Sequence, residues 1–161
     1  MTQAQPRSPY PEASEIPFAA IGQRILPIIE PLAASLPAIT AIMVSTADGF
    51  NLCALGLTPE NVERVSALGS ALHSVASTVA EAIASAEESP LDLLTIVNGS
   101  FTTVVFNISL DDGNELLLWV TTGGATMGSV IFGAREAAAA IRTTLLGGLS
   151  VSSNSDDTNE A

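Results

Sequence analysis

The chain has 161 residues, of which 47% are apolar, enough for one folded domain with a buried core. It carries 17 acidic and five basic residues, all five of them arginine, which gives a formal net charge of −12. This acidity disfavours nucleic acid and anionic lipid as partners, and the absence of lysine excludes a P-loop and Schiff-base chemistry. With one cysteine, Cys53, and one histidine, His73, the chain cannot form an intramolecular disulfide or a metal centre rich in either residue.

The two ends of the chain differ in composition from its middle. Residues 1–16 are polar and proline-rich, and residues 150–161 contain one large apolar side chain, Val151. Neither end can bury enough apolar area to offset its ordering entropy. We therefore expect two flexible tails, the second acidic, around a domain at 17–149. Without a signal peptide or a run of about 18 apolar residues, we expect a cytoplasmic protein with no membrane insertion.

The first predicted element is a helix at 18–36. Pro27 and Pro31 lie inside this segment, and each proline removes one helical hydrogen bond. We therefore expect either a kinked helix or two short helices.

A β-hairpin is predicted at 39–55. Two β-rich runs, 39–46 and 50–55, flank the dipeptide Asp48-Gly49. Asp-Gly favours a tight turn because both central positions of a type I′ turn require positive φ.

A long helix is predicted at about 60–87, with Thr58 as its N-cap and Pro59 at its first position. Large apolar side chains recur every three or four residues, and we expect this stripe to face the sheet. Its members are Val62, Val65, Leu68, Leu72, Val75, Val79 and Ile83. The opposite side is polar, and one flank contains small residues that would allow another backbone to approach closely. The polar strip consists of Glu63, Ser66, Ser70, Ser74, Ser77 and Glu81, and the small residues are Gly69, Ala76 and Ala80.

The rest of the chain predicts a three-strand meander at 92–122 and a helix at 125–147. Asn98-Gly99 and Asp112-Gly113 mark the turns of the meander, and Gly147-Gly148 is expected to end the helix. The strands are apolar on both faces, so helices must cover both. The predicted fold is α+β, with a five-stranded antiparallel sheet between layers of helices.

Three segments in this order resemble the Roadblock/LC7 family. They are LPAITAIMVSTADGFNLCA (36–54), ALGSALHSVASTVAEAI (67–83) and TTGGATMGSVIFGAREAAAAI (121–141), and the similarity extends over about 20–149. The resemblance implies a profilin-like three-layer fold with the long helix on one face and two helices on the other. It also implies a homodimer or heterodimer that joins sheet edges and packs the long helices together. It further implies binding to a small Ras-like GTPase, with no chemistry of its own.

Features that suggest other chemistry have simpler explanations. The run 123–128 opens a helix and could bind an anion, but a strand-to-helix turn explains it without a phosphate-binding motif. His73 is expected to be a packing or interface residue, and Cys53 a small buried apolar group. Acidic residues around Gly113 lack EF-hand spacing and suit a hairpin tip. We therefore predict no catalytic residue, no metal ligand and no cofactor.

Two functions remain open. The first is a dimeric, non-catalytic regulator or scaffold that binds and reorients a small Ras-like GTPase. The second is a structural dimerisation module in a signalling or cytoskeletal assembly without GTPase regulation. The expected GTPase-binding residues are Ser66, Ser70, His73, Ser74, Ser77 and Glu81, and the expected dimer contacts are Gly69, Ala76, Ala80, Leu93, Thr95 and Val97.

Overall fold

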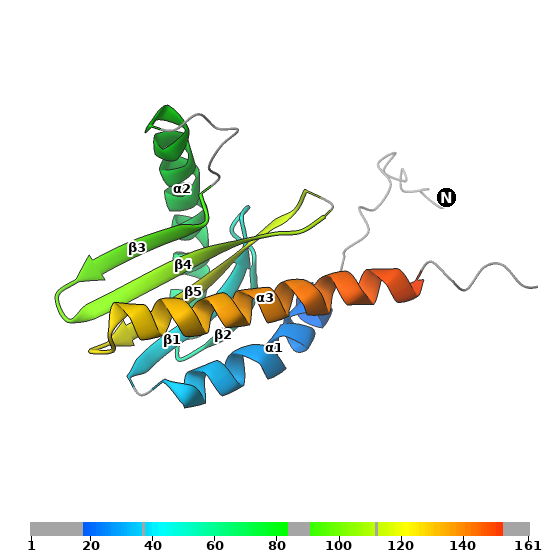
Figure 1. The fold of residues 1–161 in the computed structure, drawn as a ribbon, viewed down its shortest axis with the longest axis horizontal. Coiled ribbons are helices and arrows are strands. Elements are labelled where there is room, and N and C mark those ends of the chain that lie inside the picture. The colour runs from blue at the N-terminus through cyan, green and yellow to red at the C-terminus, as the bar shows by residue number, and fades with distance from the viewer. Residues whose placement is uncertain (1–17, 37, 84–90, 112, 153–161) are drawn as a thin grey trace, which may run out of the picture.

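Five antiparallel strands form one sheet in the order β2-β1-β5-β4-β3 (Figure 1). The structure is a computed structural model and describes residues 18–36, 38–83, 91–111 and 113–152. Its elements are α1 (Phe18–Ser35), β1 (Ile39–Thr46), β2 (Asn51–Leu55), α2 (Pro59–Ile83), β3 (Leu93–Asn98), β4 (Phe101–Ser109), β5 (Glu115–Gly123) and α3 (Met127–Ser152). The hairpin and the meander lie where the sequence predicts them, and β1 and β5 join the two units.

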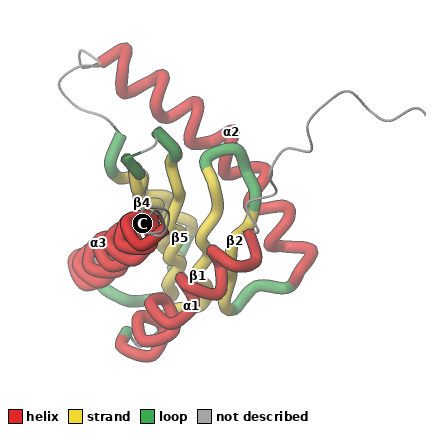
Figure 2. Tube along the Cα trace, turned by 90° about the vertical axis from the view of Figure 1, so that its right-hand side faces the viewer, coloured by secondary structure: helices red, strands yellow, loops and turns green. Residues whose placement is uncertain are grey.

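Helices cover the two faces of the sheet unequally. Figure 2 shows α1 and α3 on one side of the strands and α2 on the other. The predicted α+β class, with one long helix on one face and two helices on the other, is confirmed.

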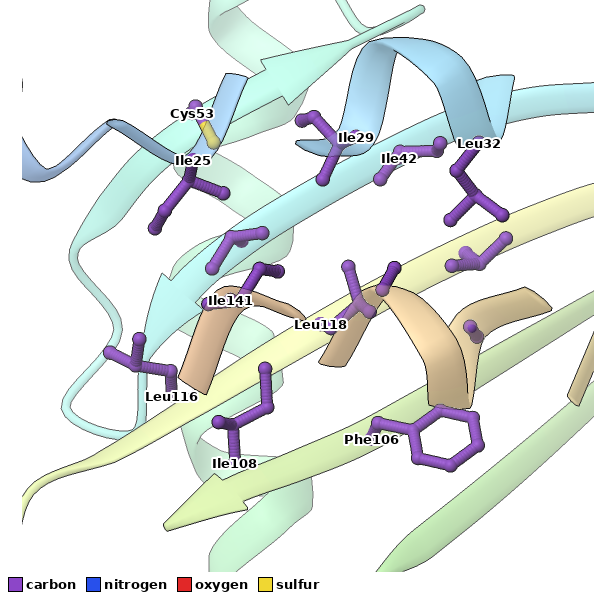
Figure 3. Close-up of a cluster of buried hydrophobic side chains, with 14 of the residues drawn as sticks. Ile25, Ile29, Leu32, Ile42, Cys53, Phe106, Ile108, Leu116, Leu118 and Ile141 are labelled. Atoms are coloured by element: carbon purple, nitrogen blue, oxygen red, sulfur yellow. The ribbon is translucent and has the colours of Figure 1, made fainter. Parts of the chain in front are cut away.

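The larger of two apolar cores lies under α1 and α3. Alternate residues of the strands point into it, including Ile42, Phe106 and Leu118, and Figure 3 shows them facing side chains of both helices. The helical side chains drawn there are Ile25, Ile29 and Leu32 of α1 and Ile141 of α3. The other face of the sheet forms a smaller core of Met43, Val105, Leu117 and Trp119. The period-two alternation of the strands thus places apolar side chains on both faces, as their sequence predicts.

α1 is a single helix, although it contains two prolines. The expectation of two short helices is wrong, because Pro27 and Pro31 are four residues apart and both lie on the exposed side. Water can therefore satisfy the carbonyl groups that these prolines leave without a backbone partner.

The β1–β2 and β3–β4 turns use glycine alone for positive φ. In the β1–β2 turn Gly49 has a φ of 94°, and in the β3–β4 turn Gly99 has a φ of 59°. Among the described residues Ala38 is the one non-glycine residue with positive φ, so the predicted type I′ turn is wrong at Asp48-Gly49 and at Asn98-Gly99. Asp112 of the third predicted turn lies outside the described residues. Asn98 pairs with Phe101, which places Gly99 first in a two-residue loop, as in a type II′ turn.

α3 extends beyond its predicted end. It continues through Gly147 and Gly148 to Ser152, because glycine weakens a helix by about 1 kcal/mol without excluding helical φ and ψ. This end lies three residues beyond the expected domain boundary at 149. The predicted tails otherwise lie outside the described residues, and their flexibility stays a prediction.

Candidate protein-interaction surface

α2 faces the sheet with its small and polar residues. Ser66 is 2% exposed, and Gly69 is also buried. A Cβ atom added at Gly69 would lie 2.4 Å from Cζ2 of Trp119, so glycine is what lets the helix lie against this ring. The predicted orientation of α2 is therefore wrong over most of the helix. Val62 and Val65 do pack against the sheet, but from Leu68 onward the large apolar residues are exposed.

Polar contacts fix this orientation of α2. The Ser66 hydroxyl donates to Sδ of Met43 at 3.4 Å. Farther along the helix, Nε2 of His73 lies 3.5 Å from a carboxylate oxygen of Glu115 on β5. The other oxygen of that carboxylate accepts a hydrogen bond from Nδ2 of Asn107 at 3.2 Å. His73 thus links helix and sheet within this chain, and its expected part in GTPase binding stays a prediction.

The large apolar residues of α2 form an exposed surface, which we call the apolar stripe. It consists of Leu68, Leu72, Val75, Val79 and Ile83, which are 36–82% exposed. Their spacing of three or four residues places them along one side of the helix. A contiguous exposed apolar surface of this kind marks a contact site for another molecule.

α2 covers only part of its face of the sheet. It crosses the strands, and its C-terminal end projects beyond β3 (Figure 1). Beside its N-terminal half lies an apolar groove of about 230 Å³. The groove is lined by Ala41, Met43, Leu57, Val65, Ile96, Thr103, Trp119 and Thr121. Val65 also continues the spacing of the apolar stripe, so groove and stripe lie side by side.

Within the described residues β3 is an edge strand, and it pairs there with β4. Leu93 packs against the core under α1 and α3, whereas Leu94 and Ile96 pack against the core under α2. Val97 is 63% exposed at the end of the strand. Of the predicted dimer contacts, those on β3 are thus accessible along the strand edge. Gly69, in contrast, is buried against Trp119 of the same chain.

The other predicted binding residues divide between two environments. Ser66 is buried, and Ser70 and Ser77 are half-buried, as are the small residues Ala76 and Ala80. Ser74 and Glu81 are exposed. The strip is therefore available to a partner only along one margin.

Sequence analysis missed an exposed aromatic pair that joins the β1–β2 turn to the start of α1. Phe50 follows Gly49 in the β1–β2 turn, and Phe18 begins α1. Their rings stack with centroids 5.3 Å apart and an interplanar angle of 11°. Their separation of 32 positions hides this pair from any periodic pattern, although a phenylalanine directly after a turn glycine is a local signal.

The described residues contain no group of three or more histidine, cysteine or acidic side chains that could hold a metal ion. Burial raises the pKa of the Cys53 thiol from 9.0 to about 11, which keeps it protonated and poorly nucleophilic at neutral pH. The run 123–128 forms the connection from β5 into α3, with Gly124 at a φ of 96°. In the part of the chain that the structure describes, no helix is long and apolar enough to span a bilayer.

Solved structures with this architecture identify the fold. A Roadblock/LC7 domain from Streptomyces avermitilis is 19% identical, covers 74% of this chain and 95% of its own, and superposes with a TM-score of 0.63. The gliding protein MglB from Thermus thermophilus is 15% identical, with coverages of 83% and 97% and a TM-score of 0.67. Myxococcus xanthus MglB is 13% identical, with coverages of 92% and 98% and a TM-score of 0.64. The sequence matches no protein-family model and no curated protein. The chain has a Roadblock/LC7-type fold.

Proposed function

We propose that the protein is a dimeric, non-catalytic regulator of a small Ras-like GTPase. The observation that carries this proposal is the apolar stripe of α2, which no part of the described chain covers. Burial of such a stripe contributes roughly 25 cal/mol for each Å² removed from water, so an uncovered stripe favours association.

The second copy is the occupant that fits both the stripe and its surroundings. The groove beside α2 is apolar, and side chains of an amphipathic helix from another copy would fill it. β3 lies at the margin of the same face, and its outer edge, which no described strand pairs, would pair with the equivalent strand. In a two-fold arrangement each stripe supplies the side chains that the other copy's groove accepts.

The GTPase is proposed from the fold and from the lack of chemical groups. The Roadblock/LC7-type fold is that of a family that binds Ras-like GTPases, and the described residues contain no group of three or more histidine, cysteine or acidic side chains that could hold a metal ion. Such a protein can alter hydrolysis only by stabilising one arrangement of the GTPase's own catalytic loops.

Oligomeric state tests the first half of the proposal. Light scattering after size exclusion should give twice the chain mass at micromolar concentration, and Val75→Asp should give a monomer with unchanged helix content. Phe132→Asp is the matched control, because Phe132 is 66% exposed but lies on α3. A monomeric wild-type protein would overturn the dimer.

Binding to GTPases tests the second half. Ras-like GTPases of the same genome, each loaded with GDP or a non-hydrolysable GTP analogue, would be titrated against the wild-type dimer by calorimetry. One of them should bind with a preference for one nucleotide state. A stable dimer that binds none of them would favour the alternative, a structural dimerisation module.

A further inference from the structure

The aromatic pair of Phe18 and Phe50 is exposed although it lies beside well-packed elements. Phe18 is 42% and Phe50 is 55% exposed, and neither contributes to the two apolar cores. Two adjacent phenylalanines held at the surface lose hydrophobic stabilisation that burial would provide. Phenylalanine, like the other aromatic residues, is enriched in protein interfaces relative to the rest of the surface.

Hydrogen bonds hold Phe50 rigidly in the turn. Its N–H donates to Oγ1 of Thr46 at 3.0 Å, and its carbonyl accepts from the N–H of Thr46 at 2.8 Å. Gly49 packs against α2, where a Cβ atom would lie 3.1 Å from the carbonyl oxygen of Ser66. A partner that binds this aromatic pair therefore has little backbone entropy to remove, which favours tight binding.

The pair lies away from the proposed dimer contact. The turn contacts α2 at Ser66, Ala67 and Ser70, and at 3.6 residues per turn these residues point away from the apolar stripe. The strand that follows Phe50 is β2, which occupies the sheet edge opposite to β3. Each protomer of a dimer thus keeps one aromatic pair accessible.

Acidic residues lie in the turn that contains Phe50 and on the first turns of α2, against which this turn packs. Asp48 is exposed in the same turn, and Glu63 is exposed one helical turn before Ser66 and Ala67. Glu60 and Arg64 are exposed on the same first turns of α2, so carboxylates outnumber the one cation there. A complementary surface presents an apolar depression bordered by lysine or arginine.

We infer that Phe18 and Phe50 anchor the GTPase, one GTPase on each protomer, through an apolar depression with a basic border. This inference rests on the proposed function and specifies which surface carries it. The inference moves the proposed GTPase contact from the polar strip of α2 to the β1–β2 turn. Ser74, on the exposed margin of the polar strip, would lie at the periphery of that contact.

Matched phenylalanine variants test this assignment with the GTPase that wild type binds. Phe50→Ala should weaken binding about 10- to 30-fold, the range of an aromatic anchor, whereas Phe132→Ala on α3 should leave the affinity within about twofold. Asp48→Asn should weaken binding about two- to fivefold at low salt, and high salt should remove this difference. Calorimetry should give two GTPases per dimer.

Each outcome decides a separate point. If wild type binds no GTPase, the proposed function falls, and this inference falls with it. If wild type binds but Phe50→Ala binds equally well, or if the stoichiometry is one GTPase per dimer, this inference alone is overturned. Melting curves check that each variant is folded, and if Phe50→Ala unfolds, the salt dependence of Asp48→Asn decides.

Discussion

Gly69 sets the distance between α2 and the sheet. Because a Cβ atom there would lie 2.4 Å from Trp119, Gly69→Ala must push the helix outward or displace the indole ring. We expect the free energy of unfolding to fall by about 1–2 kcal/mol, since overpacking outweighs the better helix propensity of alanine. Urea unfolding would measure this change.

Gly147→Ala is the control for that experiment. Gly147 lies inside α3, and no neighbouring atom lies within 4 Å of a Cβ built there. Alanine should therefore stabilise the protein by about 0.5–1 kcal/mol through helix propensity alone. Equal effects of the two substitutions would mean that Trp119 does not limit the approach of α2.

Cys53 should make stability fall at alkaline pH. Burial raises its pKa from 9.0 to about 11, so the folded state holds its proton where the unfolded chain has released it. This contribution is complete below pH 9 and is lost as the pH rises toward 11, where the loss reaches about 2 kcal/mol. The chain has no lysine and one tyrosine, so few other side chains titrate in this range.

Urea unfolding of wild type and Cys53→Ala at pH 8, 9, 10 and 11 would test this prediction. The free energy of unfolding of the variant should change much less between pH 9 and 11 than that of wild type. Parallel pH profiles of the two proteins would show that the thiol does not govern alkaline unfolding.

At the scale of elements, α1 contains a proline that lowers its stability. Pro27 lies inside the helix with its ring exposed, so it removes a backbone hydrogen bond without contributing to the core. Pro27→Ala should raise the free energy of unfolding by about 1–2 kcal/mol, after the added entropy of the unfolded chain is subtracted. Pro59→Ala is the control, because the first position of α2 has no helical bond to restore. A lower melting temperature for Pro27→Ala would contradict this account.

The elements themselves were predictable, but the orientation of α2 was not. Periodicity and turn dipeptides locate the hairpin, the meander and the long helix because these signals act over a few residues. Leu72 and Val75 have the spacing of a core-facing stripe, and hydrophobicity alone does not tell whether the same sheet or another chain covers them. The small residue at Gly69 fits the indole of Trp119, 50 positions away, and no local pattern contains that fit.

At the scale of the whole molecule, net charge should regulate the proposed dimer. Two chains of −12 repel each other, and salt screens this repulsion because the Debye length falls from about 10 Å at 0.1 M to about 3 Å at 1 M. The dissociation constant should therefore fall about three- to tenfold between 50 and 500 mM NaCl, as measured by analytical ultracentrifugation. Weaker association at high salt would indicate that complementary ion pairs hold the dimer instead.

The central position of β5 also constrains how the protein is made. Val44 of β1 pairs with Leu118 of β5, which closes a loop of about 70 residues, and loop-closure entropy makes such pairing slow. During synthesis the edge of β1 that pairs with β5 therefore stays unpaired until the ribosome has released β5. α2 emerges in this interval with its apolar stripe uncovered. The nascent chain thus exposes both an open strand edge and an apolar helix, which are the features that molecular chaperones recognise and that aggregation exploits.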